Sequence, residues 1–205
     1  MKIKICGITT LDDALMCADL GIDYLGFNFY PKSSRYISPA KAAGIIEKLP
    51  PGCVPVGVFV NSHIDAIKTI QQQTTIQCIQ LHGNESFNVC QSISLPLIKA
   101  ISVKSIRDLD NLAQFASIST LLIDSFDNAY GGTGSLADWK LASIAAKRYP
   151  IMLAGGLNAD NIAIAISRVA PASIDICTGT EASPRSKSKI KIERLLKTVR
   201  GVLTS

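Results

Sequence analysis

The chain around Asp124 combines the residue types of a proton-transfer site with those of a loop that can close over a ligand. A short apolar run at 121–123, typical of a buried strand, ends in the Asp124 carboxylate. Three glycines follow, Gly131, Gly132 and Gly134, and glycine adopts backbone angles that other residues avoid. A carboxylate half-buried at a strand end can have its pKa raised and hold a proton near neutrality. We therefore interpret Asp124 as a candidate general acid, with a turn or helix-capping aspartate as the alternative.

Other polar or reactive side chains lie where further predicted strands end, or in the loops that follow. They are Cys6, Arg35, His82, Asp175 and Cys177. Taken singly, each has an ordinary explanation, because a lone cysteine is usually a packed small hydrophobe and a lone histidine a satisfied structural residue. Their common position after predicted strands is what suggests a shared site.

Strand-like and helix-like patterns alternate along the whole chain. Eight runs are predicted as strands, at 2–6, 24–29, 54–60, 75–81, 96–101, 119–124, 150–154 and 173–177. Helix starts are predicted from capping residues at Thr10, Ser38, 62–65, 135–138 and Asn158, and a last helix ends the chain. The run at 54–60 is nearly all apolar, as expected for a strand covered on both faces.

This alternation predicts an α/β fold built from eight strand–helix units with a parallel sheet. We expect a single domain over residues 1–205, a (β/α)8 TIM barrel near the lower size limit of that fold. An open doubly wound sheet is the alternative, but it rarely needs eight units, and a GxGxxG motif is missing after the first strand. In a barrel, functional residues lie at the rim formed by the carboxyl ends of the strands.

Closure of the barrel makes the first strand a neighbour of the eighth. Lys4 and Cys6 have the same parity along the first strand, so both are expected to face the interior. A buried lysine requires a partner of opposite charge. We predict that Asp175, on the eighth strand, is the partner of Lys4.

The seventh and eighth loops of such barrels are the usual place for a phosphate group. Gly155 and Gly156 follow the seventh strand, and Gly179 and Thr180 follow the eighth. Exposed backbone N–H groups and a short helical turn at 180–183 would bind the anion. Tight turns that need glycine for conformational reasons alone are the alternative.

Composition excludes several classes of protein. The chain enters a strand pattern at 2–6, with no signal-peptide pattern and no apolar run long enough to span a bilayer, which predicts a cytoplasmic protein without a membrane partner. Its six cysteines include no CxxC pair, which argues against a zinc site, and we expect no metal. Most of the cysteines are predicted to be buried hydrophobes.

The net charge of +5 comes mainly from one segment. Between Arg185 and Arg200, seven Lys or Arg residues accompany a single acid, Glu193. These residues flank an apolar stripe with helical spacing, which predicts an ordinary amphipathic helix with a solvated face. We therefore expect no nucleic-acid partner.

Several motifs, in order along the chain, together resemble one enzyme family. They are 4–9, 26–27 with 30–33, 35–39, 57–61, 80–83, Asp124 with 131–134, and 138–139. As a set these motifs are similar to those of the phosphoribosylanthranilate isomerase family, and they cover essentially the whole chain. No single motif decides the resemblance, which rests on the set.

The resemblance implies a cofactor-free Amadori rearrangement in tryptophan biosynthesis. The substrate would be N-(5-phosphoribosyl)anthranilate and the product 1-(2-carboxyphenylamino)-1-deoxyribulose 5-phosphate. By the same resemblance, Asp124 would be the general acid that opens the ribose ring, and Cys6 the general base that removes the C2 proton. Arg35 would bind the anthranilate carboxylate. His82, Asp175 and the glycine-rich loops are expected to contact this phosphorylated small molecule, and the sequence leaves a monomer and a homodimer open.

The chain departs from the family pattern at five positions. Asn28 replaces an aliphatic residue, Cys177 and Thr178 replace serines, Arg185 replaces glycine, and Ser188 stands where an acid is common. The last four lie beside the expected phosphate loop, so they bear on its geometry. They do not touch the expected acid or base.

Two other functions compete with this interpretation. Another phosphate-binding barrel isomerase, such as the Amadori enzyme of histidine biosynthesis, predicts two catalytic aspartates and half-barrel repeats, whereas here a cysteine stands first and no clear repeat is seen. A non-catalytic barrel that binds a phosphorylated metabolite is the other alternative. The presence of both Cys6 and Asp124 argues against it.

Cys177 adds a hypothesis that is particular to this chain. Cys6 and Cys177 should both face inward near the same rim, on neighbouring strands. A disulfide needs Cα atoms roughly 4.4–6.8 Å apart, which such neighbours can meet unless barrel stagger places them in different layers. The alternative is that Cys177 only fills the volume of the serine.

Overall fold

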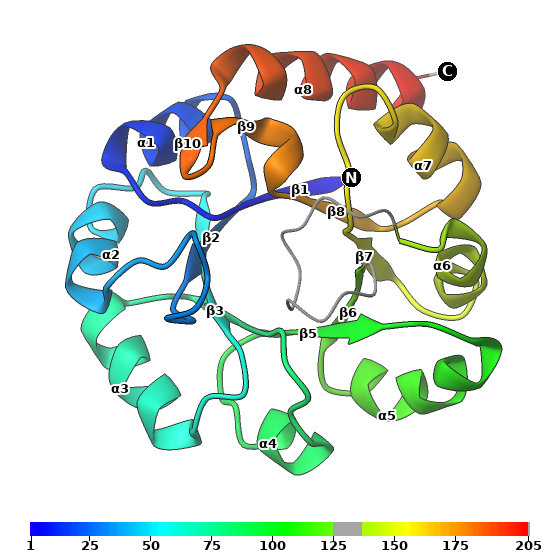
Figure 1. Cartoon of the computed structure of the whole chain (residues 1–205), viewed down its shortest axis with the longest axis horizontal. Coiled ribbons are helices and arrows are strands. Elements are labelled where there is room, and N and C mark those ends of the chain that lie inside the picture. The colour runs from blue at the N-terminus through cyan, green and yellow to red at the C-terminus, as the bar shows by residue number, and fades with distance from the viewer. Residues whose placement is uncertain (125–136, 205) are drawn as a thin grey trace.

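The computed structural model describes residues 1–124 and 137–204 of the chain. Eight parallel strands pair in sequence order, and the eighth pairs with the first, so the sheet closes into a barrel (Figure 1). The strands are β1 (Lys2–Cys6), β2 (Tyr24–Asn28), β3 (Val54–Phe59), β4 (Cys78–Leu81), β5 (Leu97–Ser102), β6 (Thr120–Asp124), β7 (Ile151–Leu153) and β8 (Ser173–Ile176). The predicted (β/α)8 barrel is confirmed.

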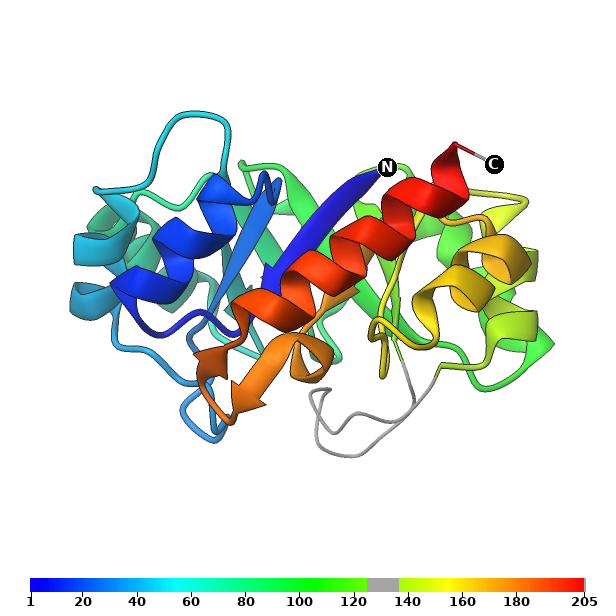
Figure 2. The same cartoon turned by 90° about the horizontal axis from the view of Figure 1, so that it is seen from above.

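Helices follow the strands and surround the barrel (Figure 1). They are α1 (Leu11–Asp19), α2 (Pro39–Ile46), α3 (Ile64–Thr74), α4 (Phe87–Gln91), η1 (Ile106–Asn111), α5 (Leu112–Ala116), α6 (Trp139–Ala146), α7 (Ile162–Val169) and α8 (Lys189–Leu203). Between β8 and α8 the chain forms a 3₁₀ turn, η2 (Thr178–Thr180), and a hairpin of β9 (Glu181–Ser183) and β10 (Ser186–Lys187). This hairpin lies at the end of the barrel where β1 terminates (Figure 2).

Local capping explains where several helices begin. The side chains of Thr10 and Ser38 accept hydrogen bonds from backbone N–H groups in the first turns of α1 and α2, as predicted. Asp138 does the same for α6, whereas 135–136 of the predicted start lie outside the described residues. The prediction for Asn158 is wrong, because α7 begins later, at Ile162, and the Asn158 side chain instead accepts from N–H groups of the preceding turn.

Most strand boundaries lie close to the predicted ones, and β4 differs most. It begins at Cys78 rather than at residue 75. Helix α3 extends to Thr74, and Thr75 ends it with a left-handed φ of 53°. Because a residue in this conformation leaves the helix without continuing into a strand, the strand starts only after the turn.

Apolar side chains fill two layers. The barrel interior holds a cluster that belongs to the strands and their ends, made by Val56, Cys78, Ile98, Ala100, Leu122, Met152 and Ala154. A larger layer lies between the sheet and the helices, and it includes Cys17, Cys53 and Cys90. Burial raises the pKa of the Cys17 thiol to about 12 and that of Cys78 to about 11. The prediction that most cysteines are packed hydrophobes is confirmed.

The basic C-terminal segment is only partly the predicted helix. Helix α8 starts at Lys189 and buries its apolar stripe, but Arg185 and Lys187 belong to the loop and second strand of the hairpin. Lys187 is buried, with 6% of the residue exposed, so its assignment to a solvated face was wrong. Among the described residues, no helix is both long and apolar enough to cross a membrane.

Candidate active site

The rim where the strands end brings Asp124 and His82 into contact. Asp124 is the last residue of β6, and His82 follows β4. The imidazole Nε2 lies 3.0 Å from Asp124 Oδ2, and Nδ1 lies 2.7 Å from the amide nitrogen of buried Gln80. With that amide donating to Nδ1, His82 Nε2–H donates to the carboxylate and fixes its orientation. The glycines at 131–134, expected to cover Asp124, lie outside the described residues.

Cys6, at the end of β1, has the electrostatic surroundings of a reactive thiol. Its side chain is hydrogen-bonded to the Cys177 thiol. That hydrogen bond and the positive charges of Lys4 and Lys187 outweigh burial and lower the pKa of Cys6 well below its ordinary value. The same contact, with burial, raises the pKa of Cys177. Cys6 is therefore the thiol of this pair that ionises first.

Lys4 and Asp175 form the predicted buried pair. Lys4 Nζ lies 3.0 Å from each carboxylate oxygen, and Lys4 is fully buried. Burial alone would lower the pKa of Lys4, but the charges of Asp175 and Cys6 raise it above its ordinary value. Burial raises the pKa of Asp175 to about 6, against the opposing effect of Lys4. The pair links β1 to β8 directly beneath Cys6.

The loop after β7 has the backbone that its glycines allow. Gly155 and Gly156 adopt φ angles of 85° and 60°, which other residues rarely take. The Gly156 carbonyl accepts hydrogen bonds from the side-chain amides of Asn158, at 3.3 Å, and Asn161, at 2.9 Å. These contacts hold the loop in one shape.

The loop after β8 packs against the loop after β7. A Cβ atom on Gly179 would lie 2.0 Å from the Leu157 carbonyl oxygen, so only glycine permits this approach. The helical turn expected at 180–183 lies earlier, at Thr178–Thr180, because the next residues pair in the hairpin. Thr180 is fully buried, and its hydroxyl donates to the Cys177 carbonyl at 2.8 Å, so the side chain stabilises this turn.

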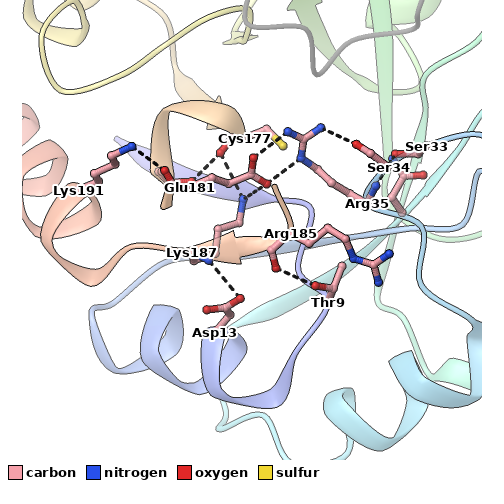
Figure 3. Close-up of polar contacts among 12 residues, drawn as sticks. Thr9, Asp13, Ser33, Ser34, Arg35, Cys177, Glu181, Arg185, Lys187 and Lys191 are labelled. Atoms are coloured by element: carbon pink, nitrogen blue, oxygen red, sulfur yellow. Dashed lines mark hydrogen bonds and ion pairs between the residues drawn. The ribbon is translucent and has the colours of Figure 1, made fainter. Parts of the chain in front are cut away.

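Arg35 is anchored at the rim by a two-point contact with a carboxylate (Figure 3). Its Nε and Nη2 each donate to the Glu181 carboxylate at 2.7 Å. Lys187 Nζ lies 3.4 Å from the same carboxylate and donates to the Cys177 carbonyl at 3.2 Å. Sequence reasoning gave no role to Glu181 or Lys187, because nothing in a local pattern shows that a hairpin folds these side chains back onto Arg35.

A separate cavity of about 620 Å³ opens at the opposite end of the barrel. Its walls come from the amino ends of strands, and its polar rim includes Lys2 and Tyr24. It contains none of the candidate residues. Because the ionisable and glycine-rich elements converge at the other rim, we assign the site there.

A (β/α)8 barrel with a low-pKa thiol, a rim carboxylate and two glycine-rich loops defines a barrel enzyme equipped for proton transfer on an anionic small molecule. Residues 3–198 match the family model described as N-(5'phosphoribosyl)anthranilate (PRA) isomerase. The chain therefore belongs to the phosphoribosylanthranilate isomerase family, whose members are isomerases of the intramolecular oxidoreductase type. The resemblance inferred from the motifs is confirmed.

Individual relatives are similar to this chain over nearly their full length. An N-(5'-phosphoribosyl)anthranilate isomerase of Geotalea uraniireducens is 42% identical over 98% of this chain and 99% of its own. A phosphoribosyl anthranilate isomerase solved with reduced 1-(o-carboxyphenylamino)-1-deoxyribulose 5-phosphate is 37% identical, with a TM-score of 0.88 over 98% of this chain and 99% of that one. Monomers of the dimeric Thermotoga maritima isomerase are 36% identical, with a TM-score of 0.88 and the same coverage.

Proposed function

We propose that this chain converts N-(5-phosphoribosyl)anthranilate to 1-(2-carboxyphenylamino)-1-deoxyribulose 5-phosphate, with Cys6 and Asp124 as its base and acid. The observation that carries the proposal is that Cys6, with the charges of Lys4 and Lys187 beside it, ends β1 at the same rim where Asp124 ends β6. An Amadori rearrangement needs one group that donates a proton and one that removes a proton from carbon. The two residues supply these functions without a cofactor.

The reaction then follows from the two groups in order. Asp124 protonates the ring oxygen of the ribose, and the ring opens to a Schiff base between C1 and the anthranilate nitrogen. The Cys6 thiolate removes the proton from C2, which leaves an enolamine. Tautomerisation of the enolamine gives the ketone at C2 and the amine at C1, so the substrate is oxidised at C2 and reduced at C1 with no net redox change.

The two charged ends of the substrate are assigned to separate groups. Arg35 binds the anthranilate carboxylate, because a guanidinium pairs with a carboxylate through two parallel hydrogen bonds. Gly155, Gly156 and Gly179 bind the phosphate through backbone N–H groups, and Thr180 supports them from within the turn. His82 orients Asp124, and Asp175 holds Lys4 beside Cys6.

The proposal extends to the oligomeric state, the cellular location and the partners of the enzyme. The Thermotoga maritima relative is dimeric, and we propose a monomer or a homodimer for this chain. Biosynthesis of an amino acid from soluble phosphorylated intermediates is consistent with action in the cytoplasm, on a small molecule and without nucleic acid.

A turnover assay tests the proposal. Loss of the fluorescence of the anthranilate substrate is followed for the wild-type protein and for Cys6→Ala and Asp124→Ala. We expect turnover only with the wild type. Turnover of the ribosylated imidazole substrate of histidine biosynthesis, or binding of a phosphorylated ligand without any turnover, would replace this function with one of the two alternatives.

A further inference from the structure

A further buried ion pair lies beside the histidine that contacts Asp124. Lys99, on β5, and Glu85, in the loop between β4 and α4, are 2.8 Å apart, and only 4% and 2% of their side chains are exposed. The register of the sheet sets Lys99 opposite Leu81, the last residue of β4 and the residue before His82. A charged pair with this little exposure therefore lies against the segment that carries the imidazole.

The pair binds the main chain on both sides of His82. Lys99 Nζ donates to the Gly83 carbonyl at 2.7 Å and, more weakly, to the Leu81 carbonyl at 3.4 Å. The Glu85 carboxylate accepts from the Gly83 N–H, at 3.0 and 3.1 Å to its two oxygens. The main chain of His82 cannot shift without stretching these charge-assisted hydrogen bonds, which are stronger than neutral ones.

The same carboxylate ties this segment to the end of β3. Glu85 Oε1 accepts from the Asn61 N–H at 2.8 Å, and Asn61 has a left-handed φ of 49°. A Cβ atom on Gly83 would overlap the Asn61 side chain, so the two loops pack as closely as glycine allows. The His82 N–H donates to the Phe59 carbonyl at 2.8 Å. His82 is therefore held from β3, from β5 and from its own loop.

The chemistry of the pair points to a role in geometry. Apolar side chains of similar volume in place of a buried ion pair are often neutral or stabilising, but they make no directed contacts to particular N–H and carbonyl groups. We propose that Lys99 and Glu85 are positioning residues for His82: they hold its main chain so that the imidazole stays 3.0 Å from the rim carboxylate. Gln80 holds the ring from its other nitrogen, and the pair holds the backbone that carries the ring. The inference rests on the proposed role of Asp124 as the general acid.

Removing both charges together tests the proposal without leaving one of them buried and unpaired. In Glu85→Gln/Lys99→Met the side-chain volumes are nearly unchanged, and an amide oxygen still accepts from one N–H. We expect kcat for N-(5-phosphoribosyl)anthranilate to fall about tenfold with KM changed less than twofold, because the acid is displaced while the groups that bind the substrate are not. Glu85→Asp, which keeps the charge but shortens the reach, should give a smaller fall and serves if the double variant folds poorly. Ile192→Val, at a fully buried residue of α8 across the barrel from β4 and β5, is the control for loss of stability and should leave kcat unchanged (Figure 1).

Substitution of His82 separates positioning from general structure. His82→Ala should lower kcat, and Glu85→Gln/Lys99→Met should lower it no further in that background, although its effect on the melting temperature should be retained. The chain has two histidines, so His82→Ala also assigns the imidazole signals in an NMR spectrum. In Glu85→Gln/Lys99→Met the ring signals of His82 should shift, and those of exposed His63 should not.

The outcomes of these measurements distinguish the inference from the proposed function. A fall in kcat that persists in the His82→Ala background, unchanged His82 ring signals, or a wild-type kcat in His82→Ala would overturn the inference. If His82→Ala lowers kcat and Glu85→Gln/Lys99→Met does not, only the positioning role of the pair fails. A wild-type kcat in Asp124→Asn would refute the acid itself, and the inference with it.

Discussion

At the scale of single residues, the site depends on how two ordinary groups are altered by their neighbours. The Cys6 thiol has a lowered pKa because Cys177 hydrogen-bonds to it and Lys4 and Lys187 lie close by. Asp124 is oriented by His82, which Gln80 holds from its other nitrogen. The proposed acid, Asp124, is thus oriented by a neighbour, and the proposed base, Cys6, has neighbours that control its charge.

The first prediction concerns Asp124, the proposed general acid. Asp124→Asn is nearly isosteric and keeps an oxygen for His82, but it has no proton to deliver to the ribose ring oxygen. We expect kcat to fall by about 10²–10⁴-fold, the usual contribution of general acid catalysis, with KM and the melting temperature little changed. The exposed Asp110→Asn is the control. A kcat close to that of the wild type in Asp124→Asn would rule out this residue as the acid.

At the scale of elements, the end of β1 and the end of β8 bring two thiols together. Cys6 and Cys177 meet through their side chains, so stagger of the barrel does not separate them into different layers. The register Ile5 with Ile176 leads directly to these two positions. Both cysteines are free in the structure.

This contact predicts a reversible loss of activity in dilute hydrogen peroxide. The Cys6 thiolate attacks the peroxide oxygen, giving a sulfenic acid and hydroxide; the Cys177 thiol then attacks the Cys6 sulfur, and water leaves as the disulfide forms. We expect a linked Cys6–Cys177 peptide in non-reducing mass spectrometry and full recovery with dithiothreitol. Cys177→Ser should give no linked peptide. Because no disulfide can form in this variant, the Cys6 sulfenic acid should be oxidised further and activity lost irreversibly. Identical irreversible loss in both proteins, with no linked peptide, would contradict the prediction.

The hairpin of β9 and β10 contains a strained residue. Arg185 has a φ of 74°, a left-handed conformation that costs a residue with a Cβ atom about 1–2 kcal/mol. Glycine, the residue that the family resemblance implies at this position, would avoid this cost. Its carbonyl accepts from Thr9 Oγ1 at 2.9 Å, which holds the conformation in place.

Arg185→Gly should therefore stabilise the protein. The free energy gained by relieving the strain exceeds the entropic cost of the added flexibility of glycine in the unfolded chain. We therefore expect the free energy of unfolding, measured by urea titration, to rise by about 0.5–1 kcal/mol. Arg185→Ala removes the same guanidinium but keeps the Cβ atom, so it should give no such gain. Equal stabilisation by both substitutions would mean that charge, and not backbone strain, is the cause.

At the scale of the whole molecule, closure of the barrel places a charged pair inside the protein. Lys4 on β1 and Asp175 on β8 lie where the first and last strands meet. The pKa of Asp175 is raised to about 6 from an ordinary 3.8. A carboxyl with a raised pKa contributes stability that is fully present below its ordinary pKa and is lost as pH rises through about 6.

Lys4→Met should make the stability of the folded protein depend more steeply on pH. Removing one partner of a buried pair costs about 3–5 kcal/mol, because it leaves an uncompensated charge. Without Lys4 the pKa of Asp175 rises further, so the carboxyl protonates in the folded protein at pH 5 and the loss of stability is smaller there than at pH 8. Urea unfolding at both pH values measures the difference, with the exposed Lys2→Met as control. An equal loss of stability at both pH values would contradict this prediction.

The sequence by itself determined the barrel, the burial of most cysteines and the pairing of Lys4 with Asp175. Each of these depends on periodic patterns, on side-chain parity along a strand, or on the rule that a buried charge needs a partner. The motif set was also enough to identify the family. Such information is local or follows directly from closing the sheet.

Only the tertiary structure decided how the rim is assembled. His82 and Asp124 are 42 residues apart, and Arg35 and Glu181 are 146 apart, so no local pattern pairs them. The sequence pattern places Lys187 on a solvated helix face, whereas in the structure it lies in the hairpin and is buried. The physical reason is that side-chain contacts at the rim depend on loop backbone angles and on the stagger of the closed barrel, neither of which a periodic pattern encodes.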